Sequence, residues 1–212
     1  MINGCKVICM TPARERNRKG AGDRLRPEIL SAAASLVAEG GADALSLRAI
    51  ARRAGVTAPA IYAHFKDIDA VRNAVVAETF SELADWLARG AQDRTDPVDR
   101  LRATCRAYVD YGFRNPRQYA ILFSTPFELP DLESPKSLAT MQGGNAFAIL
   151  LDAIKACVDA GRSRSTRIED DAAAVWLALH GYVSLTAALP DFPWPPTDTL
   201  LDNMIDRLAQ LS

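Results

Sequence analysis

The sequence has little of what would place it in a membrane or outside the cell. No uninterrupted apolar run approaches the roughly 18 residues that cross a bilayer. Residues 1–10 contain a single lysine and do not end in the small-residue cleavage site of a secretory signal. We therefore expect a cytoplasmic protein with no membrane partner. Met10 is an alternative start, in which case residues 1–9 would be a leader.

Cysteine is scarce as well, with four residues in 212. Cys5 and Cys9 have no histidine or third cysteine nearby to complete a metal site. Cys105 and Cys157 fall on the apolar faces of expected helices, where a thiol packs as a small hydrophobe. A phosphate-binding glycine loop and a nucleophile elbow are also missing. The sequence therefore predicts no metal, no cofactor and no enzymatic activity.

The net charge of -1 conceals an uneven distribution. Residues 1–66 contain 11 Lys and Arg against 5 Asp and Glu, whereas residues 67–212 contain 14 against 21. A basic first third on an acidic body favours a polyanionic partner at one end only. A solvated basic tail, containing Arg14, Arg16 and Arg18, is the alternative interpretation.

Helical periodicity extends over nearly every segment after residue 24, and no strand-like alternation or internal repeat accompanies it, so we predict an all-α fold. The first helix ends at Gly40–Gly41, and a Pro-rich loop occupies residues 126–135. The other expected helical segments span 46–54, 57–65, 69–89, 97–114, 119–123, 144–160 and 169–189, with a last helix after Pro196.

Two of these helices are short and almost contiguous. Ser46 is placed to cap the first and Thr57 the second, with Pro59 in the first turn, where a missing N–H costs nothing. Gly55 permits a tight reversal between them. This is the arrangement of a helix-turn-helix, whose second helix presents its N-terminal residues to the major groove of DNA.

The stretch from Ile29 to Val71 resembles the DNA-binding domain of the TetR family of bacterial regulators. The matching residues are Ala33, Gly41, Leu47, Ile50, Ala51, Ala54, Gly55, Val56, Thr57, Ile61, Tyr62, His64 and Phe65. The resemblance implies an N-terminal three-helix DNA-binding domain and a C-terminal helical domain for ligand binding and dimerisation. We assign residues 1–23 to a basic flexible arm, 24–68 to the DNA-binding domain and 69–212 to the second domain.

The resemblance also assigns DNA contacts. Tyr62 and His64 match positions that touch backbone phosphates, although His64 would otherwise be a core residue. Arg48 matches a position that reaches a base edge, where arginine prefers guanine. Lys66 is expected to contact a phosphate by its charge. Thr57 is expected to do so at a helix N-terminus.

Four residues are expected to face the groove without polar side-chain atoms: Ala58, Pro59, Ala60 and Ala63. They can contact thymine methyl groups but cannot read bases by hydrogen bonding, so Arg48 should carry much of the base discrimination. The chain departs from the family pattern at Ile68, where a lysine is frequent. The basic arm would compensate for that missing phosphate contact.

In the second domain, Trp176, His180 and Gly181, together with the earlier Asn115, Pro116 and Tyr119, resemble a subgroup named for a Trp-His-Gly signature. Trp176 and His180 share a helix face, and Gly181 would allow another helix to approach closely. Apolar and aromatic walls are usual for small-molecule sites. The residues expected to line an effector pocket are Tyr108, Tyr111, Phe123, Phe147, Trp176 and His180. The alternative is that they form the domain core, with His180 a hydrogen-bonded buried histidine.

Residues 169–189 are apolar around most of their helix circumference, which favours burial on more than one side, and the final helix carries a broad apolar stripe. We expect them to pack with their copies in a second subunit, simple intrachain packing being the alternative. The predicted interface residues are Val175, Leu179, Tyr182, Leu201, Met204, Ile205 and Leu208.

Together these features predict a DNA-binding transcription regulator that acts as a homodimer. We expect a repressor that leaves a palindromic double-stranded operator when a small, largely apolar effector binds, with residues 69–89 as the transmitting helix. The alternative is a regulator or activator without an effector, acting as a protein-interaction module.

Overall fold

The computed structural model describes residues 22–123 and 143–212, and these are helical throughout apart from short connections. One isolated antiparallel bridge joins Ser163 and Leu211. The all-α prediction is confirmed. The helices are α1 (Gly22–Gly40), η1 (Ala42–Ala44), α2 (Leu47–Ala54), α3 (Ala58–Tyr62), α4 (Ile68–Ala91), α5 (Pro97–Arg114), α6 (Pro116–Leu122), α7 (Gly144–Asp159), α8 (Ile168–Ala188) and α9 (Thr197–Leu208).

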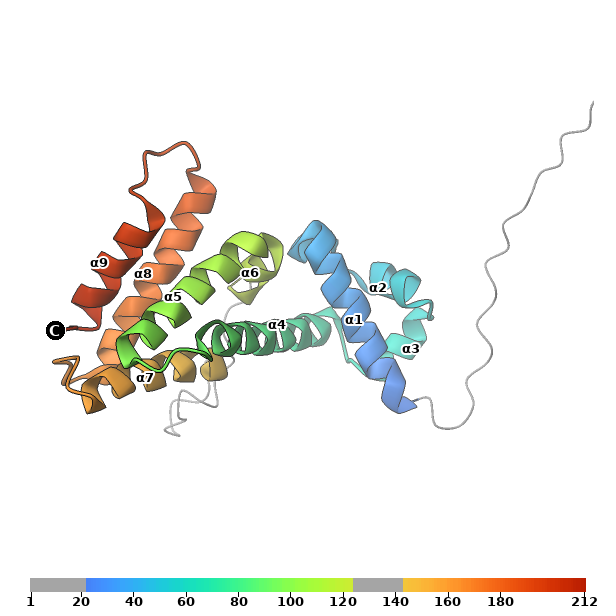
Figure 1. The fold of residues 1–212 in the computed structure, drawn as a ribbon. Helices are drawn as coiled ribbons and strands as arrows, with labels where there is room; N and C mark the ends of the chain where they lie inside the picture. The colour runs from blue at the N-terminus through green and yellow to red at the C-terminus, as the bar shows by residue number, and fades with distance from the viewer. Residues whose placement is uncertain (1–21, 124–142) are drawn as a thin grey trace, which may run out of the picture.

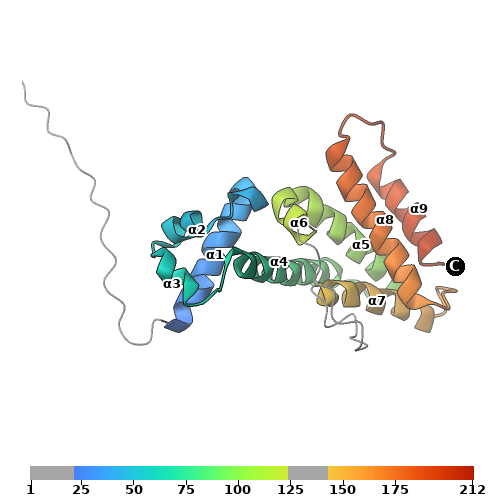
Figure 2. The same cartoon turned by 180° about the vertical axis from the view of Figure 1, so that it is seen from behind.

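The molecule is elongated, with a small helical cluster at one end and a larger one at the other (Figure 1). Helices α1, α2 and α3 form the small cluster, and α5 to α9 form the larger one. Helix α4 runs between the two and packs on α1, α5, α6 and α7 (Figure 2). None of the helices in the described ranges combines the length and apolarity that a membrane span requires.

The turn between α2 and α3 follows the sequence prediction closely. Ser46 caps α2, because its Oγ accepts a hydrogen bond from the backbone N–H of Ala49 at 3.1 Å. Gly55 ends α2 in the left-handed region at φ 67°, which glycine adopts without steric cost. Only Val56 and Thr57 separate Gly55 from the start of α3 at Ala58, so a tight helix-turn-helix results.

Helix α3 is shorter than predicted, since it ends at Tyr62 and not at Phe65. The N–H of His64 bonds to the carbonyl of Ile61 at 2.9 Å, which tightens the last turn. Phe65 then turns inward and is buried, with the Arg26 guanidinium 5.0 Å from its ring centroid. Burial of this phenylalanine therefore takes precedence over continuation of the helix.

The larger cluster is held by close packing of α5 against α8 and by ion pairs between α5 and α9. A Cβ built on Gly112 of α5 would lie only 2.6 Å from Cγ1 of Val183 in α8, so a side chain there would push the helices apart. Arg102 pairs with Asp206 at 2.7 Å, and Arg106 pairs with Asp202 at 2.7 Å. These contacts fix α8 and α9 on α5.

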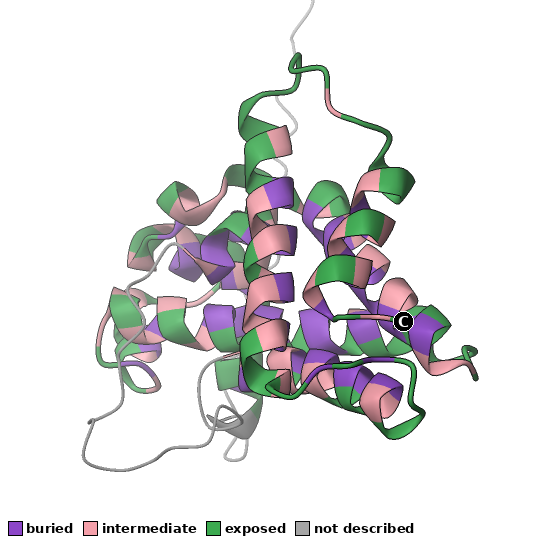
Figure 3. Cartoon of the chain, turned by 90° about the vertical axis from the view of Figure 1, so that its left-hand side faces the viewer, coloured by how far each residue is buried: buried purple, intermediate pink, exposed green. Residues whose placement is uncertain are grey.

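Five of the seven predicted interface residues lie inside this chain's own core, contrary to the dimer prediction for them. They are Val175, Leu179, Tyr182, Leu201 and Ile205. Helices α8 and α9 direct these side chains toward the rest of the larger cluster, which covers them, so they are not free to contact a second subunit. Met204 and Leu208 are only partly buried. Figure 3 shows this burial along the chain.

Candidate DNA-binding surface and ligand cavity

The exposed side of α3 is flat and largely without polar groups, apart from one tyrosine. Ile61 is buried and fixes α3 on the rest of the cluster, whereas Tyr62 is 56% exposed with its ring in solvent. Pro59 is exposed, and Ala58 and Ala60 are partly buried. A helix surface with such short side chains can approach a base-pair edge closely.

Polar groups surround α3 at both of its ends. Thr57 occupies the N-cap position of α3, but contrary to the capping prediction its side chain makes no capping bond, so its hydroxyl is available beside the helix N-terminus. Lys66 is exposed at 3.7 Å from the Asp67 carboxylate, and His64 is only partly buried. The structure therefore brings Thr57, Tyr62, His64 and Lys66 to one end of the molecule, as a phosphate-binding surface requires.

Arg48 and Arg53 of α2 differ in the hydrogen bonds that their guanidinium groups make within the protein. Arg53 donates two hydrogen bonds to the Glu39 carboxylate, at 2.7 and 2.5 Å. These bonds lower the pKa of Glu39 and raise that of Arg53. Arg48 is exposed and, within the described part of the chain, makes no hydrogen bond or ion pair. Its guanidinium is therefore the one of this pair that is free to meet a base or a phosphate.

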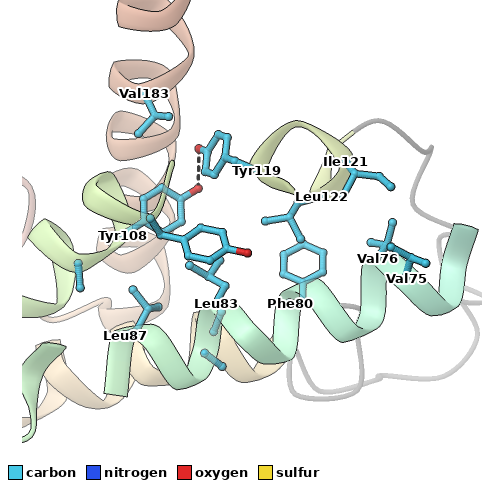
Figure 4. Close-up of a cluster of buried hydrophobic side chains, with 14 of the residues drawn as sticks. Val75, Val76, Phe80, Leu83, Leu87, Tyr108, Tyr119, Ile121, Leu122 and Val183 are labelled. Atoms are coloured by element: carbon cyan, nitrogen blue, oxygen red, sulfur yellow. Dashed lines mark hydrogen bonds between the residues drawn. The ribbon is translucent and has the colours of Figure 1, made fainter. Parts of the chain in front are cut away.

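A cavity of about 340 Å³ lies in the larger cluster, with walls that are mainly aliphatic and aromatic. Tyr108, Phe123, Phe147 and Trp176 line it, as the sequence predicts. The remaining lining residues are Phe80, Leu83, Leu87, Thr104, Cys105, Gly143, Gly144, Ala146, Leu150, Glu169, Ala173 and Leu179. Figure 4 shows Phe80, Leu83, Leu87 and Tyr108 gathered on the inner faces of their helices.

The other two predicted pocket residues, Tyr111 and His180, do not line the cavity. Tyr111 packs against Trp86, with ring centroids 5.9 Å apart, and burial raises the pKa of its phenol. His180 lies behind the cavity wall, where its ring contacts Phe123 at 4.2 Å between centroids. For Tyr111 and His180 the core interpretation fits the structure better than the pocket interpretation.

Four polar side chains form a hydrogen-bonded chain that includes part of the cavity wall. The indole N–H of Trp176 donates to the Tyr108 hydroxyl at 3.2 Å. The hydroxyls of Tyr108 and Tyr119 lie 2.9 Å apart, as the dashed line in Figure 4 shows, and that of Tyr119 lies 2.7 Å from Nδ1 of His180. We call this series from Trp176 to His180 the polar chain.

The direction of the polar chain depends on the charge state and the tautomer of His180. Burial lowers the pKa of His180, which keeps its imidazole neutral, and raises the pKa of Tyr108 to about 12. When the proton of the neutral imidazole is on Nε2, Nδ1 accepts from Tyr119, Tyr108 donates to Tyr119 and Trp176 donates to Tyr108. The polar hydrogens of Trp176, Tyr108 and Tyr119 are then all used within the polar chain.

Tyr119 was not among the predicted site residues, although it links the cavity wall to α6. Its partners Tyr108 and His180 lie 11 and 61 positions away, so no local spacing in the sequence could reveal the pairing. Helix α6 in turn reaches the DNA-binding end, because Arg117 donates to the carbonyl of Ala38 in α1 at 3.1 Å. The cavity and α1 are therefore connected through α6 as well as through α4.

Comparison with known families gives two matches along the chain. Residues 29–75 match the family described as bacterial regulatory proteins, tetR family. Residues 101–208, or 108 of 212 positions, match the family described as Tetracyclin repressor-like, C-terminal domain.

Individual relatives and structures agree with these matches. HTH-type transcriptional regulator Rv1816 of Mycobacterium tuberculosis is 27% identical over 78% of this chain and 69% of that protein. HTH-type transcriptional activator FasR of Mycolicibacterium smegmatis is 29% identical over 52% of each chain.

Two solved structures share the fold. A protein with unknown function from Rhodococcus sp. RHA1 superposes with a TM-score of 0.70 and 24% identity, over 87% of this chain and 93% of that one. The regulator FadR from Bacillus subtilis, solved in complex with stearoyl-CoA, has a TM-score of 0.64 and 15% identity, over 87% and 97%.

Proposed function

The chain belongs to the TetR family of helix-turn-helix transcription regulators, and we propose that it is a homodimeric repressor whose release from a palindromic operator is triggered by a small, largely apolar effector. The observation that carries the proposal is the joint presence of two features in one chain. One is an exposed helix-turn-helix in which Arg48 makes no hydrogen bond or ion pair with the described residues, and the other is an aromatic cavity in a separate helical cluster.

On the DNA side, the proposal assigns α3 to the major groove. Ala58, Pro59 and Ala60 would face the base edges, while Thr57, Tyr62, His64 and Lys66 would hold the phosphates. Arg48 would supply hydrogen-bonded readout of a guanine. Such a surface binds chromosomal DNA, so we place the protein in the cytoplasm and assign it no catalytic role.

On the ligand side, the cavity supports an apolar effector, and FadR shows that the fold accommodates a ligand with a long apolar part. FasR, a relative described as an activator, supports the second candidate function, in which the protein activates transcription. We keep the Trp-His-Gly assignment as part of the proposal, because Trp176 and His180 are joined through the polar chain.

For the dimer, the proposal moves the interface to the outer face of α8. Leu177, Leu185 and Leu189 are at least half exposed there, at 65%, 50% and 50%. Gly181 lies between them, and a Cβ built on it meets nothing within 4 Å, so none of the helices in residues 22–123 and 143–212 occupies the space beside it. An apolar face around a small residue suits the same face of a second copy.

The division into an arm (1–23), a DNA-binding domain (24–68) and an effector domain (69–212) is retained as part of this proposal. Most of the arm lies outside the described residues, although α1 already begins at Gly22. Coupling would run through α4, which joins the two domains. The contact of Arg117 with α1 gives a second route.

The experiment is an unbiased selection of double-stranded DNA with the purified full chain, followed by binding titrations over a range of salt concentrations. We expect enrichment of a palindrome, bound with an affinity that falls steeply as salt rises, because released counterions drive phosphate contacts. If the selection at low salt enriches no particular duplex, the proposal is wrong. Transcription from the selected site with and without the protein distinguishes repression from activation.

A further inference from the structure

The charge and hydrogen-bonding groups around the cavity indicate which chemical class of effector it takes. Most of the lining is aliphatic or aromatic, and five aromatic rings contribute to it: Phe80, Tyr108, Phe123, Phe147 and Trp176. Several of these rings touch each other, with centroid distances of 5.9 Å for Phe147 and Trp176 and 6.2 Å for Phe80 and Phe123. The rings therefore form a continuous aromatic wall.

The side-chain hydrogen-bond donors in the described wall already bond to other groups of the protein. Trp176 donates to Tyr108, the Tyr108 hydroxyl shares a hydrogen bond with the Tyr119 hydroxyl, and the Thr104 hydroxyl donates to the carbonyl of Arg100 at 3.0 Å. Burial raises the pKa of Cys105 to about 12, so it remains a neutral thiol, which is only a weak donor. Among the described lining residues none is Lys, Arg or His. An anionic ligand would therefore find no cation in this wall.

Among the lining residues that the structure describes, the one ionised group is the carboxylate of Glu169, in the first turn of α8. Its neighbours in that turn have partners, since Asp170 pairs with Arg167 and Asp171 accepts a bond from Gln210 at 2.9 Å. Glu169 has no such partner among the residues that the structure describes, and it is exposed. It therefore places an unpaired negative charge at the rim of the aromatic cavity.

We propose that the effector is a small lipophilic organic cation, with its apolar body against the aromatic wall and its cationic group facing Glu169. Aromatic faces and a carboxylate both attract a weakly hydrated cation, and a neutral ligand would cover part of the carboxylate without pairing it. A volume of about 340 Å³ lies at the small end of ligand pockets, which limits the size of the apolar body. This inference rests on the proposed function, which makes the cavity the effector site.

The test compares three probes that share one alkyl chain: decyltrimethylammonium, decanol and decanoate, all kept below the concentration at which they aggregate. Calorimetric titration of the full chain at neutral pH should rank the cation first and decanoate last. Glu169→Gln should weaken the cation roughly tenfold while decanol changes by less than roughly twofold. Asp170→Asn is the matched control in the same helix turn and should leave the binding of all three probes unchanged.

Equal or tighter binding of decanol or decanoate would overturn the inference, and so would unchanged cation binding in Glu169→Gln or failure of all three probes to bind. An operator-release assay keeps this result separate from the proposed function. Release by decanoate alone would refute the cation and leave effector-controlled repression in place. Tight, Glu169-dependent binding of the cation without release of DNA would support the cation site and refute effector release.

Discussion

At the scale of single residues, what a side chain can do for DNA depends on what it already binds within the protein. Arg48 and Arg53 lie in the same short helix and carry the same charge. Arg53 is held in a two-bond contact with Glu39, whereas Arg48 is uncommitted within the described residues. A guanidinium without an internal partner keeps its full set of donors for a base edge.

We predict that Arg48→Ala weakens binding to the selected operator by about 1–3 kcal/mol and relaxes the preference at one base pair. The loss should be smaller on random duplexes, because the lost contact is to a base and not to a phosphate. Competitive titrations on the operator, on single-base variants and on random DNA measure this. Arg53→Ala is the matched control and should not change the base preference. If Arg48→Ala lowers the affinity for all duplexes equally, this arginine contacts a phosphate and not a base.

Single residues also show which structural features the sequence pattern predicts and which it does not. Ser46 and Gly55 were predicted to cap and end α2, and the structure confirms both, because caps depend on neighbours within four positions. Tyr108, Phe123, Phe147 and Trp176 line the cavity as predicted, while Tyr111 and His180 do not. Periodicity indicates that an aromatic side chain is inside, but it cannot distinguish a cavity wall from the layer behind it. That difference depends on contacts between distant helices.

At the scale of helices, packing distances decide how rigidly the ligand-binding cluster is held. Gly112 brings α5 close to α8, and Val183 occupies the space that a side chain would need. The same two helices provide Tyr108 and Trp176 to the cavity wall, so their separation sets the geometry of that wall. A change of a single methyl group at this contact should therefore be measurable.

We predict that Gly112→Ala lowers the free energy of unfolding by about 1–3 kcal/mol, because the added methyl group overlaps Val183. Urea unfolding followed by circular dichroism measures this. In the double variant Gly112→Ala with Val183→Ala the clash is removed, so its loss should be smaller than the sum of the two single losses. Additive losses would show that the cost at Gly112 has another origin.

Helices α8 and α9 mark where pattern reading failed at this scale. Helix α8 is apolar on several sides, which indicates more than one covered face, whereas α9 has one broad apolar stripe. The sequence could not say which stripe faces the chain's own core, and five of the seven residues predicted for the interface belong to that core. The exposed leucines of α8 belong to a different stripe, set by how α8 rests on α5 and α7.

At the scale of the whole molecule, the outer face of α8 leads to a prediction about assembly. Leu177→Glu combined with Leu185→Glu should convert the dimer to a monomer, because two carboxylates would be buried against their copies without partners. Light scattering coupled to size-exclusion chromatography measures the mass. Ala88→Glu, at an exposed position of α4, is the control and should leave the mass unchanged. A wild-type chain that is itself monomeric at micromolar concentration would contradict the proposed interface.

Dimerisation would also explain how so short a recognition helix binds DNA tightly. One recognition helix as short as α3 makes few contacts, whereas two copies fixed on one scaffold bind as a unit with a high effective concentration. The monomeric variant should therefore lose most of its affinity for the selected palindrome, although its helix-turn-helix is intact. Operator titration on the same samples links assembly to function.

The contact between Arg117 and the carbonyl of Ala38 has a mechanical consequence for the DNA-binding end. Helix α1 packs on both α4 and α6, and η1 also contacts α6, so the DNA-binding end rests on two helices of the rest of the chain. A shift of α6 relative to α4 would therefore have to be accommodated where α1 rests on both helices. Such a shift would tilt α1, and α3 with it, without a change inside the helix-turn-helix.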